Sequence, residues 1–194
     1  MQTLSPLTEL DAVNIMLSTI GESPISSLSA DQSTVDVSLA RQILRETTIQ
    51  VEETGWHFNT EINWVMTRTT IGEILIPANC VQVDSSGPDV SLDVAMRGSR
   101  LYNRTTHTYV FTKDVTVDMT LLLDFEEIPQ AARHYITVRA ARVFQQRMVG
   151  SDTLAAFTER DEARARAALK KLDSNTADYN ILSGSWSVAR SLTR

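Results

Sequence analysis

The residues that could carry out chemistry in this chain are few and lie far apart. The single cysteine, Cys80, is distant from any histidine, so a buried structural thiol is favoured over a nucleophile. Glu126 and Glu127 could act as acid and base, but adjacent carboxylates usually point apart, and their place before a helix start already explains them. The histidines lack the close spacing of a metal-binding helix: His57, His107 and His134. We therefore predict no catalytic residue, no metal site and no cofactor.

Three aromatic residues, Trp56, Phe58 and Trp64, fall on alternate positions of one segment, which predicts a strand with an aromatic inner face. Aromatic strips stack on sugars. A polysaccharide-hydrolysing enzyme that combines this strip with a carboxylate pair is therefore the alternative function. Alternate aromatics on a strand more often build a core, and we favour that interpretation.

The charge balance argues against one large class of proteins. The chain has 194 residues, a formal net charge of −6 and a pI of about 5.1. Proteins that grip nucleic acid carry a basic excess, because phosphate neutralisation supplies most of their affinity. An acidic protein can instead surround DNA without holding it. No apolar run is long enough to cross a bilayer and no secretory signal is visible, so we expect no membrane insertion. We expect the chain to fold in a reducing cytosol.

Helical periodicity is confined to the two ends of the chain. Near the N-terminus, apolar residues recur every 3.6 positions in two segments that end at Gly21 and Gly55. Near the C-terminus, Pro129 fits the first position of a helix that Gly150 ends, and an Ala-rich segment of mixed charge predicts another helix. The predicted helices span residues 8–20, about 34–54, 129–149 and about 153–172.

The helix after Pro129 has a basic side, because Arg139, Arg142 and Gln146 fall on one part of its circumference. A solvated face is the default interpretation, and a protein interface is the alternative. We name these three residues as interface candidates. The alanines of the last helix permit close approach of another helix, within the subunit or between subunits.

The middle of the chain changes to a period of two and predicts short strands. The strongest alternation covers residues 115–125, and the segments 93–97 and 100–103 flank Gly98 as a tight hairpin would. Further short strands are predicted at 74–76, 80–83 and 109–111.

Segregated runs of helices and strands predict an α+β fold. We expect a discontinuous four-helix bundle from both chain ends, with an inserted, mainly antiparallel β region and an extended C-terminal tail. The predicted domains are a helical bundle domain of residues 1–55 and 125–182, an inserted β domain of residues 56–124, and a flexible tail of residues 183–194.

Short motifs occur in a fixed order along both ends of the chain: Glu9–Asn14, Ile20–Pro24, Ala40–Leu44, Gly55–Asn59, Asp124–Pro129, Phe144–Arg147, Asp161–Arg164, Tyr179–Leu182 and Leu192–Arg194. In order and spacing they resemble tail tubular protein A, the adaptor family of short-tailed, podovirus-type bacteriophages. The resemblance covers both ends and is weak from about residue 65 to residue 115.

This resemblance implies a structural virion protein and not an enzyme. The family forms a dodecameric ring between the portal protein and the tail nozzle (tubular protein B), and it completes the channel for genome ejection. The implied partners are the portal, the nozzle, further copies of this chain, and genomic DNA that passes without sequence-specific binding. The implied location is the short tail of the virion, after synthesis in the cytoplasm of the bacterial host. A negative lumen would let the DNA slide.

The segment after Leu182 supplies the remaining interface candidates. We expect it to become ordered on binding, along the portal, with Trp186 and Leu192 as apolar anchors. Arg194, the last residue of the motif Leu192–Arg194, is the remaining interface candidate. The loop tips at residues 84–89 and 103–107 are the predicted nozzle contacts.

Overall fold

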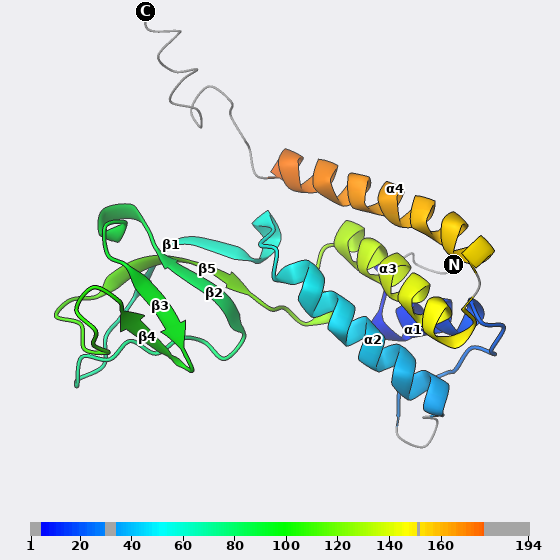
Figure 1. Cartoon of the computed structure of the whole chain (residues 1–194), viewed down its shortest axis with the longest axis horizontal. Helices are drawn as coiled ribbons and strands as arrows, with labels where there is room; N and C mark the ends of the chain where they lie inside the picture. The colour runs from blue at the N-terminus through cyan, green and yellow to red at the C-terminus, as the bar shows by residue number, and fades with distance from the viewer. Residues whose placement is uncertain (1–4, 30–33, 151, 177–194) are drawn as a thin grey trace, which may run out of the picture.

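The computed structural model describes residues 5–29, 34–150 and 152–176, without the side chains of residues 152–158. These residues form the predicted α+β fold, with helices from both ends of the chain packed together and a β region between them in sequence (Figure 1). The helices are α1 (Glu9–Ser18), α2 (Val35–Glu52), α3 (Gln130–Met148) and α4 (Asp152–Thr176).

The first two helices begin at threonine caps. The Thr8 hydroxyl accepts a hydrogen bond from the Asp11 amide at 3.1 Å, and the Asp11 carboxylate accepts one from the Thr8 amide at 3.0 Å, a reciprocal capping box. The side-chain hydrogen bond from Thr8 also lowers the pKa of Asp11. Thr34 caps α2 in the same way through the Val37 amide. Both helices end a few residues before the predicted glycines.

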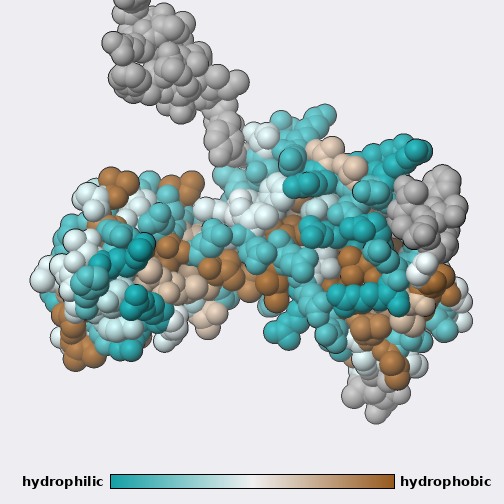
Figure 2. Space-filling model, viewed as in Figure 1, coloured by the Kyte–Doolittle hydropathy of each residue, from teal (hydrophilic) through white to brown (hydrophobic). Residues whose placement is uncertain are grey.

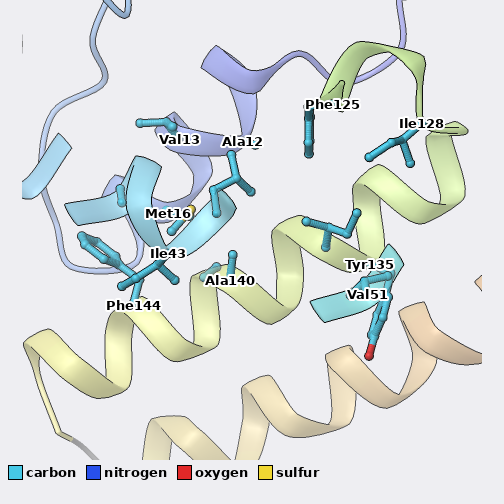
Figure 3. Close-up of a cluster of buried hydrophobic side chains, with 14 of the residues drawn as sticks. Ala12, Val13, Met16, Ile43, Val51, Phe125, Ile128, Tyr135, Ala140 and Phe144 are labelled. Atoms are coloured by element: carbon cyan, nitrogen blue, oxygen red, sulfur yellow. The ribbon is translucent and has the colours of Figure 1, made fainter. Parts of the chain in front are cut away.

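Helix α3 is the centre of the helical region, because it packs against α1, α2 and α4. Side chains from α1, α2, α3 and the segment before α3 converge on one core (Figure 3). From α4 this core receives Ala165 and Leu169, and α4 packs mainly on α3. Pro129 is the N-cap of α3 and not its first helical residue, because its ψ of 145° is extended.

The segment before α3 is fixed by one buried cation, Arg133. Its Nε donates to the Ile128 carbonyl at 2.5 Å, one terminal nitrogen donates to the Leu7 carbonyl at 2.7 Å, and the other donates to the Glu126 carbonyl. Three carbonyls from two backbone segments, one of them before α1 and the other before α3, therefore meet at one side chain. Sequence reasoning treated the charges of α3 as solvated or interfacial and did not anticipate this role.

The β region contains two small sheets. The first has the order β1-β5-β2 and is antiparallel, with β1 (Thr60–Met66), β2 (Cys80–Ser85) and β5 (Val115–Leu121). The second is the predicted hairpin of β3 (Val94–Arg97) and β4 (Arg100–Asn103). A core separate from the helical one fills this region: Met66, Ile74, Ile76, Cys80, Val94, Leu101, Phe111, Val115, Val117 and Met119.

Two of the predicted short strands are reduced to isolated bridges. Residues 74–76 contribute one bridge, between Leu75 and Arg100, and residues 109–111 contribute another, between Val110 and Glu73. Single-residue pairings of this kind do not form a ladder, so neither segment is a strand. The proposed division into domains stays a prediction.

The predicted aromatic strand is wrong in its first half. Residues His57–Asn59 form a short 3-10 helix, η2, and β1 begins at Thr60. Trp56 belongs to the turn after α2, where its indole N–H donates to the Val51 carbonyl at 2.7 Å. Trp56 and Phe58 pack against the helical core, as the core interpretation requires, whereas Trp64 is 53% exposed. The three aromatic residues therefore share no face.

A β-bulge interrupts β1 just before Trp64. Between Glu61 and Trp64 the register of β1 against β5 shifts by one residue, and Asn63 takes a left-handed φ of 55°. The Asn63 amide donates to the Asp118 carboxylate at 2.7 Å, which holds the bulge. All residues from Glu61 to Val65 are exposed, on both faces of the strand, and Met66 is buried, so the inward pattern predicted for this strand fails.

Candidate functional site

The basic side of α3 joins helices within the subunit. Arg142 Nε lies 2.5 Å from Glu162 Oε2 on α4, and Arg139 Nε lies 3.9 Å from Glu162 Oε1. A terminal nitrogen of Arg139 also donates to the Gln50 side chain on α2 at 3.3 Å. Gln146 is exposed. The structure thus groups Arg139 and Arg142 around one carboxylate, and an interface role for the three residues stays a prediction.

Helix α4 exposes most of its circumference from residue 159 onward. Two of its residues in this stretch, Ala165 and Leu169, are buried, and the surface over the helix is mostly hydrophilic (Figure 2). A shallow groove of about 400 Å³ runs along its contact with α3, lined by Arg142, Glu159, Glu162, Ala163, Arg166, Ala167 and Lys170. This surface carries both charge signs and small side chains, which suits a protein neighbour better than a small apolar ligand.

The C-terminal interface candidates lie outside the described residues. Trp186, Leu192 and Arg194 belong to the segment 177–194. Of the predicted loop tips, residues 84–89 include the end of β2 and the short 3-10 helix η3 (Gly87–Asp89), and residues 103–107 follow β4. Asp89 is buried there beside the Lys113 ammonium, whose hydrogen bond lowers the pKa of the carboxyl. Contacts with a nozzle protein stay a prediction.

The β region exposes large apolar side chains at several places. The most exposed are Ile62, Trp64, Val65, Ile71, Leu75, Val90 and Val110, each more than half exposed. Figure 2 shows hydrophobic residues at the rim of this region. In the helical region, Val35 and Val149 are exposed to this degree among the described residues. Among the described residues, large apolar side chains exposed to this degree are therefore more numerous in the β region than in the helical region.

A buried carboxyl occupies the junction between the two regions. Glu52, at the end of α2, is 1% exposed; its Oε1 accepts from the Leu123 amide at 3.2 Å, and its Oε2 has no partner among the described residues. Burial raises the pKa of Glu52 to about 7, the Leu123 amide opposes this, and the nearby Asp124 carboxylate adds to it. Sequence reasoning missed this residue, because a glutamate at the end of a helix gives no signal of burial.

Side chains around Glu52 connect the helical region to the sheet. The buried Asn59 amide donates to the Glu52 carbonyl at 2.9 Å and to the Leu121 carbonyl at 2.8 Å. A cavity of about 400 Å³ adjoins the junction, lined by Glu9, Arg41, Leu44, Arg45, Thr48, Ile49, Glu52, Asn79, Leu122, Leu123, Asp124 and Phe125. The junction is therefore a hydrogen-bonded connection and not a free linker.

The residues with catalytic potential are not brought together. Glu126 and Glu127 are exposed, and Glu126 accepts from the Glu9 amide at the start of α1 at 3.3 Å. Cys80 is buried, and burial raises the pKa of its thiol. The three histidines are exposed on separate elements. Within residues 5–29, 34–150 and 152–176, no three His, Cys, Asp or Glu side chains gather as a metal site.

The described residues form two cores, a charged helical face and a β region with exposed apolar side chains. No helix in the described part of the chain is long and apolar enough to span a membrane. Residues 10–179 match the family described as "Tail tubular protein" (Tube). The chain belongs to this family and is a structural component of a phage tail, hence of the virion.

A relative with an assigned name supports the same conclusion. The chain is 28% identical over 166 residues to "Tail tubular protein A" of Klebsiella phage KP34, which covers 85% of this chain and 87% of that protein. The expected resemblance is thereby confirmed.

Proposed function

We propose that this chain is the adaptor subunit of a short phage tail, which forms a ring between the portal protein and the tubular nozzle and completes the ejection channel. The observation that carries this proposal is the family match over residues 10–179, together with a relative named tail tubular protein A. The dodecameric state is what the resemblance to that family implies. No cofactor takes part.

The two regions of the subunit support a role with several neighbours. The helical region offers the exposed, charged face of α4, and the β region offers exposed apolar side chains. A ring subunit between two partners needs separate surfaces for its copies, for the portal and for the nozzle. Surfaces of different chemistry on two connected regions meet that need.

The charge of the subunit supports the channel role. Each copy carries a formal net charge of −6, and a ring multiplies this charge around its axis. A negative wall repels the DNA phosphates and lets the genome slide through without sequence-specific contacts. A strongly basic lumen in the assembled ring would contradict this part of the proposal.

Electron microscopy of a mixture of purified chain and portal complexes tests the adaptor role. We expect an additional ring on one face of the portal that is absent from portal alone. A portal that stays bare at saturating chain concentration would overturn the proposal. A truncation of residues 183–194 examined in the same way tests the segment with Trp186, Leu192 and Arg194: ring attachment should weaken, and unchanged attachment would remove this segment from the contact.

The candidates Arg139 and Arg142 need a test that separates surface from scaffold, because Glu162 pairs with both. Arg142→Glu alone removes the ion pair between Arg142 on α3 and Glu162 on α4. Arg142→Glu combined with Glu162→Arg restores an ion pair of opposite orientation. If the double variant folds normally and fails to assemble, Arg142 acts at an interface. If it assembles as the wild type does, Arg142 acts within the subunit.

Hydrolysis of surface polysaccharide is the second candidate function, and the raised pKa of Glu52 beside Asp124 and a cavity favours it. The burial of Glu52 argues against this function, because the residue is 1% exposed to a substrate and one of its oxygens accepts from a backbone amide. Release of reducing sugar from capsular polysaccharide by the wild type, lost in Glu52→Gln, would support the enzyme. No release by the wild type would leave the structural role alone.

A further inference from the structure

One side of the β3–β4 hairpin carries a stack of arginine and tyrosine side chains. The guanidinium carbon of Arg97 lies 3.6 Å from the centre of the Tyr102 ring. The guanidinium carbon of Arg100 lies 4.3 Å from the centre of the Tyr109 ring. The two rings meet edge to face, with their centres 4.9 Å apart. The four side chains therefore form one connected unit, which we call the Arg–Tyr stack.

Backbone pairing places two exposed aliphatic side chains on the same side as the Arg–Tyr stack. Because residues opposite each other in an antiparallel pair project to one side, Leu75 shares the side of its partner Arg100. Val110 shares the side of its partner Glu73, whose carboxylate lies 2.6 Å from Arg100. Leu75 is 55% exposed and Val110 54%, whereas Ile74 is 0% exposed and belongs to the core. We call the Arg–Tyr stack together with Leu75 and Val110 the hairpin face.

One cation of the hairpin face has no counter-charge. Arg100 is paired with Glu73, whereas Arg97 is exposed and forms no ion pair or hydrogen bond with any of the residues that the structure describes. Arg97 also lies directly opposite Arg100 in the ladder, where like charges destabilise the pairing of the strands. A side chain that served only to cover Tyr102 could be neutral and would avoid this repulsion. The subunit therefore leaves the guanidinium of Arg97 available to a carboxylate from outside.

The hairpin face has the properties of a protein contact. A guanidinium stacked on a ring keeps N–H donors free at its edge, and stacking limits the freedom that the side chain loses on binding. Arginine and tyrosine are enriched at protein interfaces, where they often dominate the affinity. The hairpin lies in the part of the β region away from the helices, which leaves it accessible to a neighbour (Figure 1).

Nucleic acid fits the hairpin face less well than protein does. Binding to a phosphate backbone draws on many cations. The chain has a net charge of −6, and the Glu73 carboxylate on this side already neutralises Arg100. The exposed aliphatic side chains of Leu75 and Val110 gain nothing from phosphate. An acidic protein segment satisfies both the free cation and these aliphatic side chains.

We propose that the hairpin face docks an acidic segment of another protein of the tail. An aspartate or glutamate of that segment pairs with Arg97, and apolar residues beside it cover Leu75 and Val110. Charge complementarity defines this occupant, because the free guanidinium matches a carboxylate and no further cation. The inference goes beyond the proposed function: it depends on the place of the chain in a tail and holds whether or not the chain forms a ring.

A carbodiimide cross-link tests the contact in tails isolated from virions. Arg97→Lys keeps the cation and supplies an ammonium group that carbodiimide joins to a carboxylate in contact with it. We expect peptides in which residue 97 is linked to an aspartate or glutamate of a different tail protein, with apolar residues beside it in sequence. Arg104→Lys is the control for the reaction, since Arg104 lies 3.3 Å from Asp93 and should link within the chain.

Two outcomes of the cross-linking would overturn the inference. Linkage of residue 97 only to carboxylates of this chain would place the subunit itself or a second copy against the hairpin face. No linkage at residue 97, in an experiment where Arg104→Lys gives its product, would show that no carboxylate lies there.

Charge reversal measures the contact without a cross-link. Arg97→Glu sets two carboxylates against each other, so the amount of the cross-linked partner per copy of this chain should fall about tenfold or more in quantitative mass spectrometry of tails. The thermal midpoint of the purified chain should not fall, because the new carboxylate can pair with Arg100. A purely structural role of Arg97 predicts the reverse, a lower midpoint and unchanged partner content.

The matched control is Arg68→Glu, which makes the same charge change at an exposed arginine of the β region outside the hairpin face. Tails with this variant should keep the full amount of the partner. Wild-type partner content in tails with Arg97→Glu would contradict the docking. So would a loss of DNA retention with unchanged protein content, because it would make nucleic acid the ligand.

Discussion

The helical region and the β region use their apolar residues differently. The helical region buries large side chains completely, among them Phe144, Met16 and Ile136, and covers them with charged helix faces. The β region has the smaller core and leaves Ile62 and Trp64 exposed on an edge strand. We conclude that the helical region contributes the larger share of the buried core and that the β region leaves more of its large apolar side chains exposed.

The largest effect should come from the helical core. Phe144→Ala removes a side chain that is 0% exposed, and we expect it to lower the free energy of unfolding by about 4 kcal/mol. Trp64→Ala removes a larger side chain from the exposed edge and should cost less than about 1 kcal/mol. Urea titration followed by circular dichroism measures both. Equal losses would contradict the division of roles between the two regions.

Arg133→Met should have the next largest effect. The substitution keeps much of the apolar stem and removes three hydrogen bonds to the Leu7, Glu126 and Ile128 carbonyls, so we expect a loss of about 3 kcal/mol. Arg133→Lys, which keeps the charge but cannot reach three carbonyls in a fork, should lose somewhat less. A variant as stable as the wild type would show that the segment before α3 does not depend on this side chain.

Glu52 links the stability of the junction to pH. Its folded pKa of about 7 lies above the ordinary value of 4.5, so the folded state holds the proton more tightly than the unfolded state. The free energy of unfolding therefore falls as pH rises from 4.5 to 7, because Glu52 ionises in the folded state at a cost. The loss is complete above pH 7 and is at most about 3 kcal/mol.

Glu52→Gln removes this titration. The variant should be more stable than the wild type at pH 8, and its advantage should shrink toward pH 4.5. Thermal midpoints measured across this range check the slope. Asp11→Asn is a useful comparison, because the pKa of Asp11 is lowered and its pH dependence has the opposite sign. A pH-independent difference between Glu52→Gln and the wild type would contradict the raised pKa.

The smallest effect concerns the contact between α3 and α4. Arg142 and Glu162 are 28% and 16% exposed and lie 2.5 Å apart, whereas Arg164 and Asp161 are 81% and 64% exposed. A double-mutant cycle to alanine should give a coupling of about 1 kcal/mol for the first pair and near zero for the second. Equal coupling energies for the two pairs would mean that partial burial does not strengthen the ion pair of Arg142 and Glu162.

Periodicity predicted the helices well because amphipathic stripes and caps are local signals. The helices predicted to start at residue 8 and at about residue 34 begin directly after the caps Thr8 and Thr34, and the hairpin around Gly98 is present. The segregated order of helices and strands also predicted the α+β class. These features depend on residues within a few positions of one another.

Tertiary features escaped prediction because no local pattern encodes them. The bulge at Asn63 is held by Asp118, which lies 55 positions away, and Trp64, expected in the core, is 53% exposed. The burial of Glu52 depends on Leu123, and the role of Arg133 depends on Leu7. The named interface candidates came from charge patterns and a family resemblance, neither of which reveals that Glu162 already pairs with Arg139 and Arg142.

The mass of the portal complex after incubation with this chain tests the central claim most directly. Native mass spectrometry should show a portal that gains the mass of a dodecamer of this chain. Binding of scattered single copies, or no increment at saturating concentration, would contradict the account of an adaptor ring.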